Sequence, residues 1–454
     1  MAANRGKPIA LVAACLIGAI PVAARAQDTT KAGQDTTTIP TVSLDQAIEL
    51  ALRVQPAVVQ ARGAVTNAQS GKREAMGAWL PTITSSGTWG LASNSRYNSA
   101  TGTFVSADRQ DSYTAGLSAS LTIFDGFQRA ATNRSASATL ASADAKLTNQ
   151  QFQVILQVKQ AFFNALAARE LVRVSQTQMQ RAEEQLKVAQ EKLAAGSATR
   201  SDTLRSRVEV GNAQLTQLTA QIALATAEAN LARLIGYDGP VRALSDSSLF
   251  VMPSLDTAAM RDEVLRTAPS VVAAEADAKV AAASVAVSRA TYFPQLRGSF
   301  SNTWSGPVGV GIDSATHESL YLTFRRQWQA RLTLSWDLFN GFTREGSVSR
   351  AVVSRESAAA QADDARRLAS AQLTQQLAAL QSTRSQITIA ISSRAAAEED
   401  LRVVRERYRL GAATIVDVLT SQVTLDQAEV SVVQAALNFL VARAQLESLL
   451  GRTL

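Results

Sequence analysis

The chain of 454 residues contains one cysteine and one histidine, and aromatic residues make up only 5% of it. His317 has no Cys or His companion at a ligand spacing, so a surface residue is favoured over a metal ligand. No phosphate-binding loop, nucleophile elbow or metal-binding spacing occurs anywhere in the sequence. We therefore expect no catalytic centre, no cofactor and no metal site, which argues against an enzyme.

Residues 1–26 predict a signal peptide. Arg5 and Lys7 precede an apolar run, and a small-x-small cleavage pattern ends at Ala26. A lipidation box ending at Cys15 is the alternative, but the apolar run continues beyond Cys15, which a mature lipoprotein would not need. Cleavage at Ala26 would remove the only cysteine and lower the formal net charge from +7 to +4. So mild an excess of basic residues does not suggest a nucleic-acid partner.

Long hydrophobic runs are also missing after the signal peptide. No stretch reaches the roughly 18 consecutive apolar residues that a membrane-spanning helix needs. Any membrane crossing is therefore expected to use strands. Residues 27–43 are polar and rich in threonine, and we expect a flexible segment there.

What the sequence does contain is an internal repeat, with one half at 44–236 and the other at 260–451. The motif Gly-x-Ala-Thr-x-x-Asp-x-Leu begins at Gly196 and again at Gly411. The linker between the halves, residues 237–259, contains Gly-Pro and is expected to be irregular.

Two further landmarks recur in both halves. Trp-Leu-Pro ends at Pro81 and Tyr-Phe-Pro ends at Pro294. IFDGF at 123–127 matches LFNGF at 338–342, with the same offset as the two glycine motifs. The offset between the prolines is shorter by two, so the change is expected to lie in the loops between these landmarks, where length is tolerated.

Each half is predicted to hold one strand hairpin, at 81–125 and at 294–340. Apolar and small residues alternate with Thr, Ser and Gly over about the 9 to 11 residues that a tilted strand needs to cross a bilayer. A soluble hairpin with one wet face is the alternative. The long polar loops, roughly 92–112 and 305–328, favour membrane strands. The alternating apolar series comprises Ile83, Trp89, Leu91, Tyr113, Leu117, Leu121, Ile123, Leu296, Phe300, Trp304, Leu332, Leu334, Trp336 and Leu338.

Four strands cannot close a membrane barrel, because the smallest bacterial barrels use about eight. An open edge in lipid would leave backbone groups unpaired. The strand count therefore predicts an assembly of several copies, without giving their number.

The rest of each half is predicted to form a long helical hairpin, at 127–235 and at 342–450. Residues 127–195 contain no proline and would extend about 100 Å as one helix. The shorter return helix and the helix before the strands together match that length. The return helices carry a narrow apolar seam, which suits either the wall of a hollow tube or an ordinary coiled-coil rod. The seam positions are Leu204, Val208, Leu215, Leu218, Ile222, Ala225, Ala229 and Ala232 in the first half and Leu419, Val423, Val430, Val433, Leu437, Leu440 and Ala444 in the second. Gly211 and Asp426 interrupt the two seams.

This ordered set of motifs, occurring twice, resembles the TolC family of outer membrane efflux and secretion proteins. The resemblance covers nearly all of the mature chain. It implies an α+β membrane protein of tandem repeats, in which a homotrimer forms a 12-stranded barrel in the outer membrane lipid and a long periplasmic barrel of helices. The helix–strand junctions would be at Pro81, Gly126, Pro294 and Gly341.

The resemblance also implies a function, that of an exit duct for an efflux pump or a type I secretion system. Its partners would be a periplasmic membrane-fusion adaptor and an inner-membrane transporter, whose type (RND, ABC or MFS) the sequence does not give. A periplasmic coiled-coil adaptor would explain the helices but not four alternating strands. A single-chain porin would explain the strands but not the helices. The adaptor-facing helix turns would be Gly196, Ser197, Ala198, Thr199, Gly411, Ala412, Ala413 and Thr414.

By the same resemblance, Asp202, Tyr408 and Asp417 would form a periplasmic gate. The chain departs from the family pattern at Ala413, where an Arg is usual, and at Thr420, where a second pore Asp is usual. The gate would then be held by fewer polar contacts, and Arg205 and Arg409 are the candidates to replace the missing Arg. The alternative for the two aspartates is a role at the helix N-terminus, because each lies three residues after a threonine.

Overall fold

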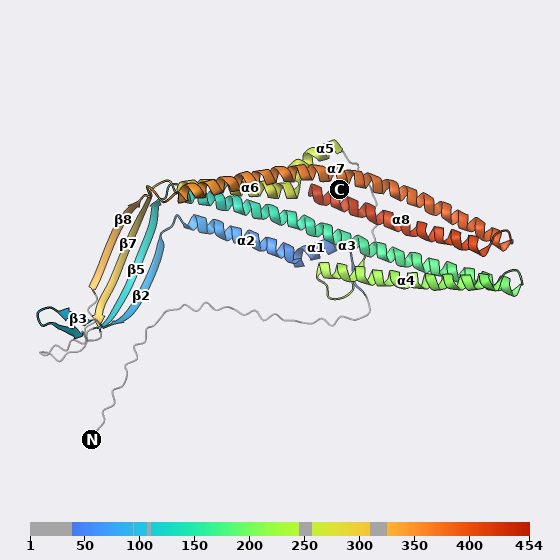
Figure 1. The fold of residues 1–454 in the computed structure, drawn as a ribbon, viewed down its shortest axis with the longest axis horizontal. Helices are drawn as coiled ribbons and strands as arrows, with labels where there is room; N and C mark the ends of the chain where they lie inside the picture. The colour runs from blue at the N-terminus through green and yellow to red at the C-terminus, as the bar shows by residue number, and fades with distance from the viewer. Residues whose placement is uncertain (1–38, 94, 107–109, 245–256, 309–324) are drawn as a thin grey trace, which may run out of the picture. The chain divides into compact units, whose positions relative to one another are not determined.

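The computed structural model describes residues 39–93, 95–106, 110–244, 257–308 and 325–454. Apart from Ile39, they belong to one compact unit, Pro40–Leu454. In this unit the strands lie at one end and two helix turns lie at the other (Figure 1). The signal peptide expected at 1–26, Cys15 and His317 lie outside the described residues.

The first half is built around one very long helix. Helix α3 packs against α4 over one part of its length and against α2 over another, while α1 contacts both α3 and α4. A long leg matched by shorter ones is the arrangement that the sequence predicted. The helices are α1 (Leu44–Val54), α2 (Pro56–Gly77), α3 (Gln128–Ala194) and α4 (Arg200–Ile235).

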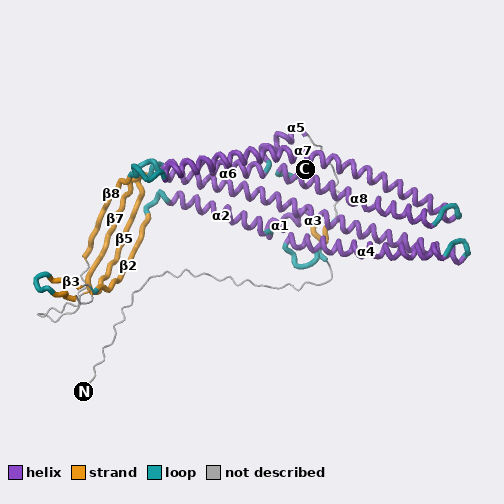
Figure 2. Tube along the Cα trace, viewed as in Figure 1, coloured by secondary structure: helices purple, strands orange, loops and turns teal. Residues whose placement is uncertain are grey.

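The second half repeats this arrangement around α7, which packs against α6 and α8 (Figure 2). Helix α3 also packs against α6 and α8, so the two halves share one body of helices. Pro56 and Pro269 each stand at the first position of a helix, where a missing N–H costs nothing. The helices are α5 (Thr257–Thr267), α6 (Pro269–Ala290), α7 (Thr343–Arg409) and α8 (Ile415–Leu450).

Four strands form one antiparallel sheet in the order β2-β5-β7-β8. The central pair, β5 and β7, joins the hairpins of the two halves, and β2 and β8 are the edges. In the segment expected to be an outer loop, β3 (Ser95–Asn98) and β4 (Thr103–Ser106) pair with each other. The sheet strands are β2 (Thr82–Ala92), β5 (Gln110–Phe124), β7 (Gln295–Val308) and β8 (Arg325–Ser335).

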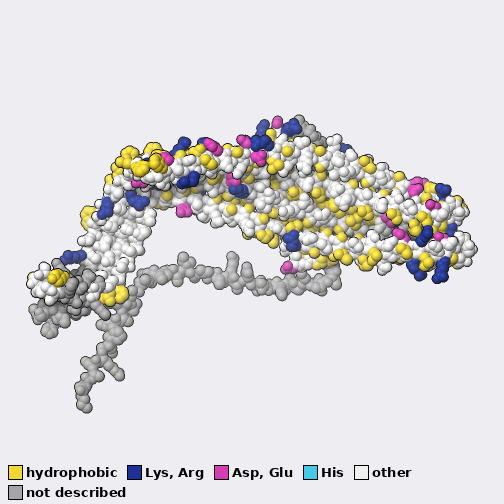
Figure 3. Space-filling view, in the orientation of Figure 1, with side chains coloured by type: hydrophobic (Ala, Val, Ile, Leu, Met, Phe, Trp, Pro, Cys, Tyr) yellow, Lys and Arg dark blue, Asp and Glu magenta, His cyan; other side chains and the backbone are white. Residues whose placement is uncertain are grey.

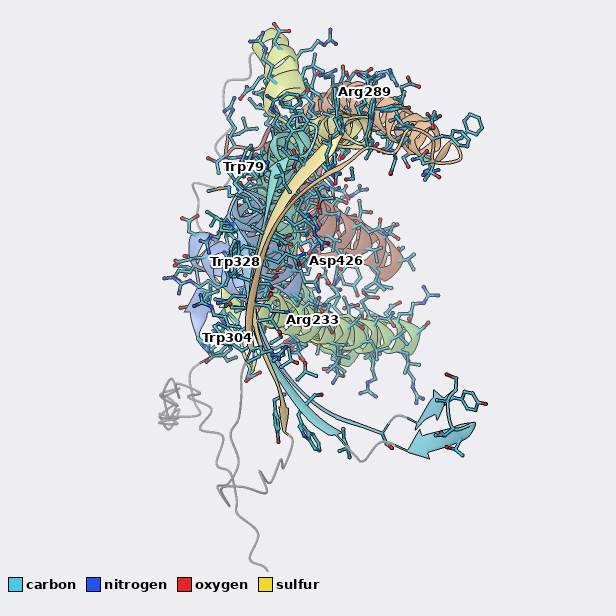
Figure 4. The ribbon with its side chains drawn as sticks, turned by 90° about the vertical axis from the view of Figure 1, so that its left-hand side faces the viewer. Trp79, Arg233, Arg289, Trp304, Trp328 and Asp426 are labelled. Atoms are coloured by element: carbon cyan, nitrogen blue, oxygen red, sulfur yellow. The ribbon has the colours of Figure 1, made fainter. Side chains whose placement is uncertain are left out.

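The register places the predicted apolar positions that are paired in the sheet on one face. Trp336 and Leu338, which were expected to continue the last strand, instead follow the end of β8 at Ser335. Ile83 lies opposite Ala119, and Ala119 lies opposite Phe300. Ile83 is 67% exposed and Trp328 is 69% exposed, so the described residues leave this apolar face uncovered. Trp304 and Trp328 come from the neighbouring strands β7 and β8 (Figure 4).

The hydrophobic core lies among the helices. Its largest fully buried side chains include Phe162, Leu231 and Leu446, which come from α3, α4 and α8. Lys159 and Glu447 form a buried ion pair within this core. No helix among the described residues is both long enough and apolar enough to span a membrane.

Two segments expected to lack structure contain a short strand pair. Thr41–Val42 (β1), in the segment expected to be flexible, pairs in parallel with Arg242–Ala243 (β6), in the expected linker. The pairing satisfies backbone groups that would otherwise need water, and it buries Val42 and Ala243 in the core. Helix α5 also begins inside the expected linker, at Thr257.

Apart from Ala232, which is buried, the predicted seam on α4 does not face α3. Helix α4 buries mainly small or polar side chains and its C-terminal end instead. The seam residues are exposed in the single chain: Leu204, Val208, Leu215, Leu218 and Ile222. An exposed apolar stripe of this kind is typical of an interaction surface.

Candidate functional site: the helix turns and the strand junctions

The first helix turn ends α3 with a glycine in the left-handed conformation. Gly196 has a φ of 76°, which a residue without Cβ adopts without strain. The Ser197 amide donates to the Lys192 carbonyl at 2.9 Å, and the Gly196 amide donates to the Leu193 carbonyl at 3.0 Å. These bonds satisfy carbonyl groups that have no partner at the end of a helix.

The second turn, which ends α7, has the same construction. Gly411 has a φ of 81°, the Ala412 amide donates to the Arg407 carbonyl at 2.8 Å, and the Gly411 amide donates to the Tyr408 carbonyl at 3.1 Å. The turn then passes through Ala413 to α8, as the first passes through Ala198 to α4. Charged side chains of both signs gather at this end of the molecule (Figure 3).

Both return helices begin with a reciprocal capping box. The Thr199 hydroxyl accepts from the Asp202 amide, while the Thr199 amide donates to the Asp202 carboxylate at 2.9 Å. Thr414 and Asp417 repeat this arrangement, with the Thr414 amide donating to the Asp417 carboxylate at 2.8 Å. The structure therefore uses both aspartates as the first-turn acids that the sequence offered as the alternative to a gate.

Asp417 accepts a further hydrogen bond, from the Thr414 hydroxyl at 2.8 Å. The donors on Thr414, its amide first, hold the pKa of the Asp417 carboxyl below its usual range. Asp417 is therefore ionised at neutral pH and lies at the exposed end of the helices.

Tyr408 is buried at the end of α7, packed in a small cluster with Leu401, Ile415 and Val418. Its hydroxyl has no hydrogen-bond partner among the described residues. Burial raises the pKa of the Tyr408 hydroxyl, and the negative charge of Asp202 raises it further. The structure thus brings Asp202 near Tyr408 without forming a hydrogen bond between them.

Neither candidate for the missing arginine makes such a contact in the single chain. Arg409 pairs with Glu406, its neighbour one turn earlier, at 3.3 Å. Arg205 forms no ion pair among the residues that the structure describes. The side chain that reaches Tyr408 is instead Lys192 of α3, whose Nζ atom lies 4.0 Å from the centroid of the ring.

One charged cluster near the turns was not predicted from the sequence. Arg181 of α3 donates to Glu429 at 2.9 and 2.6 Å and to Asp426 at 2.8 Å, both on α8. All three side chains are less than one-fifth exposed. Asp426 interrupts an apolar seam of α8, and this interruption was the only signal of the cluster in the sequence.

A second arginine faces this cluster without a full set of partners. Arg405 of α7 has its Nε and Nη2 atoms buried and without hydrogen bonds. Burial lowers the pKa of Arg405, and the charge of Arg181 lowers it further. The pKa of Asp426 is raised, chiefly by burial. The region next to the turns therefore contains incompletely paired polar groups.

The strand junctions have an unusual backbone. Phe127 and Phe342, at φ of 67° and 63°, are left-handed although they are not glycine, and each follows a left-handed glycine. Such residues are strained and persist where the surroundings enforce them. Asp125 stabilises the first junction by accepting from the Arg129 amide at 3.0 Å and from the Arg129 side chain at 2.9 Å.

The predicted junction residues lie where the helices meet the strands. Pro81 and Pro294 directly precede β2 and β7, while Gly126 and Gly341 follow β5 and β8. A Cβ on Gly126 would lie 2.4 Å from the Cβ of Phe293, so this junction is closely packed. A Cβ on Gly341 would meet nothing within 4 Å in the same chain.

Among the described residues, no group of three or more His, Cys, Asp or Glu side chains is placed to hold a metal ion. What the structure offers instead is two matched sets of helix turns and one sheet with an apolar face and two free edges.

Comparison with known proteins matches both halves. The model of a family described as outer membrane efflux protein matches residues 47–237 and 260–452. The chain belongs to this family. It is 28% identical over 352 residues to the pyoverdine export outer membrane protein OpmQ of Pseudomonas aeruginosa, which is 76% of this chain and 71% of that protein.

Two solved structures have the same fold. CusC matches with a TM-score of 0.77 and 17% identity, over 90% of this chain and 92% of that chain. VceC of Vibrio cholerae matches with a TM-score of 0.74 and 19% identity, over 90% of this chain and 96% of that chain. The predicted fold class of tandem repeats with four strands and long helices is therefore confirmed.

This efflux-family protein is an outer membrane channel with a periplasmic helical extension, of the kind that serves tripartite pumps or type I secretion systems. Family members are channels and not enzymes, which confirms that expectation. Membership also implies that the protein works as a trimer with pump partners.

Proposed function

We propose that three copies of the chain close their sheets into one 12-stranded barrel, in which β8 of each copy pairs with β2 of the next. The proposal is supported by a sheet with one exposed apolar face, one polar face and two edges that pair with no other strand among the described residues. In a bilayer such edges must be paired, and the apolar face would contact lipid.

The internal repeat supplies the register of the missing pairing. Ser120 of β5 lies opposite Ser299 of β7 within the chain. The repeat relates β5 to β8 by the offset of the two glycine motifs, and β7 to β2 by the offset of the two prolines. Between copies, Ser335 is therefore expected opposite Ser86. Both serines belong to the polar face of their strands, so this register keeps each face uniform.

The same repeat offsets explain the open space next to Gly341. Gly126 packs against Phe293 within the chain. The residues at the equivalent positions of the other half are Gly341 and Leu80. Leu80 is 68% exposed in the single chain. In the assembled barrel, Leu80 of one copy would therefore fill the space next to Gly341 of its neighbour.

The exposed seam of α4 supports the same assembly, because it gives the helices a second surface for a neighbouring copy. The test is the mass of the purified protein in neutral detergent, measured by light scattering. A mass near three subunits is expected, reduced by Leu215→Glu and kept by Gln214→Glu, which adds the same charge at an adjacent exposed position. A monomer mass for the unaltered protein would contradict the assembly.

At the other end, the two turns are proposed to receive the periplasmic adaptor. The adaptor-facing residues would be the eight that link the long helices to the return helices, 196–199 and 411–414. Their backbones are fixed by left-handed glycines and capping boxes, so each copy presents two rigid tips of the same design. The cargo would be determined by the inner-membrane transporter to which the adaptor binds.

The tips are also proposed to form the closed periplasmic gate, through Asp202, Tyr408 and Asp417. The buried hydroxyl of Tyr408 has no partner among the described residues, and the charge of Asp202 raises its pKa, which supports a contact completed between copies. Asp417 is held ionised and would place one carboxylate of each copy at the narrowest level.

Conductance in a planar bilayer tests this gate. Tyr408→Phe keeps the buried ring and removes only the hydroxyl, so a gate that uses the hydroxyl should open more readily and give a larger current. Asp417→Asn should raise the anion-to-cation permeability ratio, because it removes one negative charge of each copy from the gate. Unchanged current and unchanged ion preference in both variants would remove the gate role, leaving Asp417 as a helix cap.

A further inference from the structure

The polar face of the sheet carries charge of one sign. Arg297 of β7 lies opposite Thr333, while Arg331 and Arg325 of β8 lie opposite Ser299 and Ser305. This register places the three arginines on the same face as the hydroxyl side chains of the sheet. All three arginines are exposed, and none of them forms an ion pair among the described residues.

No acidic side chain balances them. Among the residues of the four sheet strands whose side chains the structure describes, 82–91, 112–124, 295–306 and 325–335, there is no Asp, Glu or Lys. The fourth arginine, Arg326, lies on the apolar face, where its Nε atom donates to Asn302 at 3.2 Å. The described part of the polar face is therefore neutral except for three positive charges.

The fold does not require these charges. The repeat places Thr84 of β2 where β7 has Arg297, and Gly116 of β5 where β8 has Arg331. The first half thus builds the same kind of strands with uncharged residues at both positions. Arg297 and Arg331 are also diagonal neighbours, because Arg297 lies opposite Thr333, two residues further along the strand. Their Cα atoms are expected about 7–8 Å apart, close enough for both guanidinium groups to meet one multivalent anion.

We propose that the strand portion of the duct favours anions, and that Arg297 and Arg331 form a binding point for cargo carrying carboxylate, phosphate or sulfonate groups. The proposal rests on the barrel assembly proposed above, because only closure turns the polar face toward water inside the duct. Charges of one sign on low-dielectric walls raise the local concentration of counter-ions.

The test compares the reversal potential of single channels in asymmetric KCl. Replacing all three arginines, Arg297→Gln, Arg325→Gln and Arg331→Gln, should lower the anion-to-cation permeability ratio at least about twofold near 0.1 M salt. The change should grow near 0.01 M, where the screening length is about three times longer. Arg331→Gln alone should produce part of the change, and Arg326→Gln, which removes the same charge from the opposite face of the same strand, should produce none.

A second readout does not depend on current. Pyranine, a trisulfonated dye, should bind the purified protein in neutral detergent, and its affinity should fall roughly threefold to tenfold in the triple variant and not in Arg326→Gln. Equal permeability ratios and equal dye affinities across the variants would overturn the anion proposal. Failure of the barrel proposal looks different, since the unaltered protein would then have a monomer mass and give no current.

Discussion

The Nζ atom of Lys192 lies 4.0 Å from the centroid of the Tyr408 ring and also donates a hydrogen bond to the Tyr408 carbonyl oxygen. Lys192 ends α3 in the first half, and Tyr408 ends α7 in the second. One side chain therefore joins the two tips of a subunit, and it does so through a ring that is buried. A cation over an aromatic face contributes about 0.5–1 kcal/mol at exposed sites and more when water is excluded.

Removing this link should loosen the tips. Lys192→Met keeps most of the aliphatic chain and removes the ammonium, so we expect amide hydrogen exchange around residues 408–412 to rise by roughly fivefold to thirtyfold, corresponding to about 1–2 kcal/mol. The control is Lys187→Met, which removes an exposed lysine of the same helix. Equal exchange in the two variants would show that the Lys192 contact does not hold the tips together.

The cap at Asp417 should make the second tip sensitive to acid. The pKa of this carboxyl in the folded protein lies below its ordinary value of 3.8, because Thr414 donates to the ionised form. A depressed pKa gives stability that is complete above the ordinary pKa and is lost as the pH falls through the folded pKa. Protection of the amides at 411–418, corrected for intrinsic exchange, should therefore fall between about pH 5 and pH 3.

The matched variant for this acid effect is Asp417→Asn, which cannot ionise and should show a flat profile over the same range. An identical fall in the variant and the unaltered protein would assign the acid effect to other carboxyl groups.

The Arg181 cluster should matter far more to stability than its exposed counterparts. Arg181→Met leaves Asp426 and Glu429 mostly buried without their cation, and we expect a loss of about 3 kcal/mol. Arg173→Met breaks an exposed pair with Glu170 and should cost less than about 1 kcal/mol. Thermal unfolding of the two variants in the same detergent makes the comparison, and similar midpoints would contradict the importance of burial.

Substitutions of the two junction glycines should have different effects. Gly126→Ala would place a Cβ 2.4 Å from the Cβ of Phe293 in its own chain, so it should impair folding of the subunit itself. Gly341→Ala has open space in its own chain and should yield a folded subunit whose trimer dissociates at a lower temperature on gels. Because both glycines have a positive φ, the backbone penalty of about 1 kcal/mol is shared and cancels in the comparison. Matching defects in the two variants would argue against a contact between copies at Gly341.

The repeat made much of this fold predictable from the sequence. The left-handed turns at Gly196 and Gly411 follow from local chemistry, since a glycine ends one helix and a threonine three residues later starts the next. The faces of the strands follow from their alternation with a period of two residues. Both kinds of signal depend only on residues close together in the sequence.

Contacts between distant residues were not predictable. No sequence pattern near Lys192 indicates its contact with the ring of Tyr408. Arg181 contacts Asp426 only because α3 packs against α8. The strained Phe127 and Phe342 were also missed, because a left-handed phenylalanine is enforced by its surroundings and opposes its own preference. The α4 seam was recognised, but its partner was not, since a helical period shows that a face is apolar and does not show what covers it.

Disulfide trapping of the proposed strand pairing tests the barrel assembly most directly. The only cysteine of the sequence is Cys15, in the predicted signal peptide, so Ser86→Cys with Ser335→Cys introduces the sole pair of thiols expected in the exported chain. Directly opposed Cβ atoms lie about 4.5–5.5 Å apart, and mild oxidation should join the copies into a covalent trimer. The control pair, Ser86→Cys with Leu334→Cys, points to opposite faces and should remain monomeric on denaturing gels. Efficient crosslinking of the control, or none in the Ser86 and Ser335 pair, would contradict the proposed barrel.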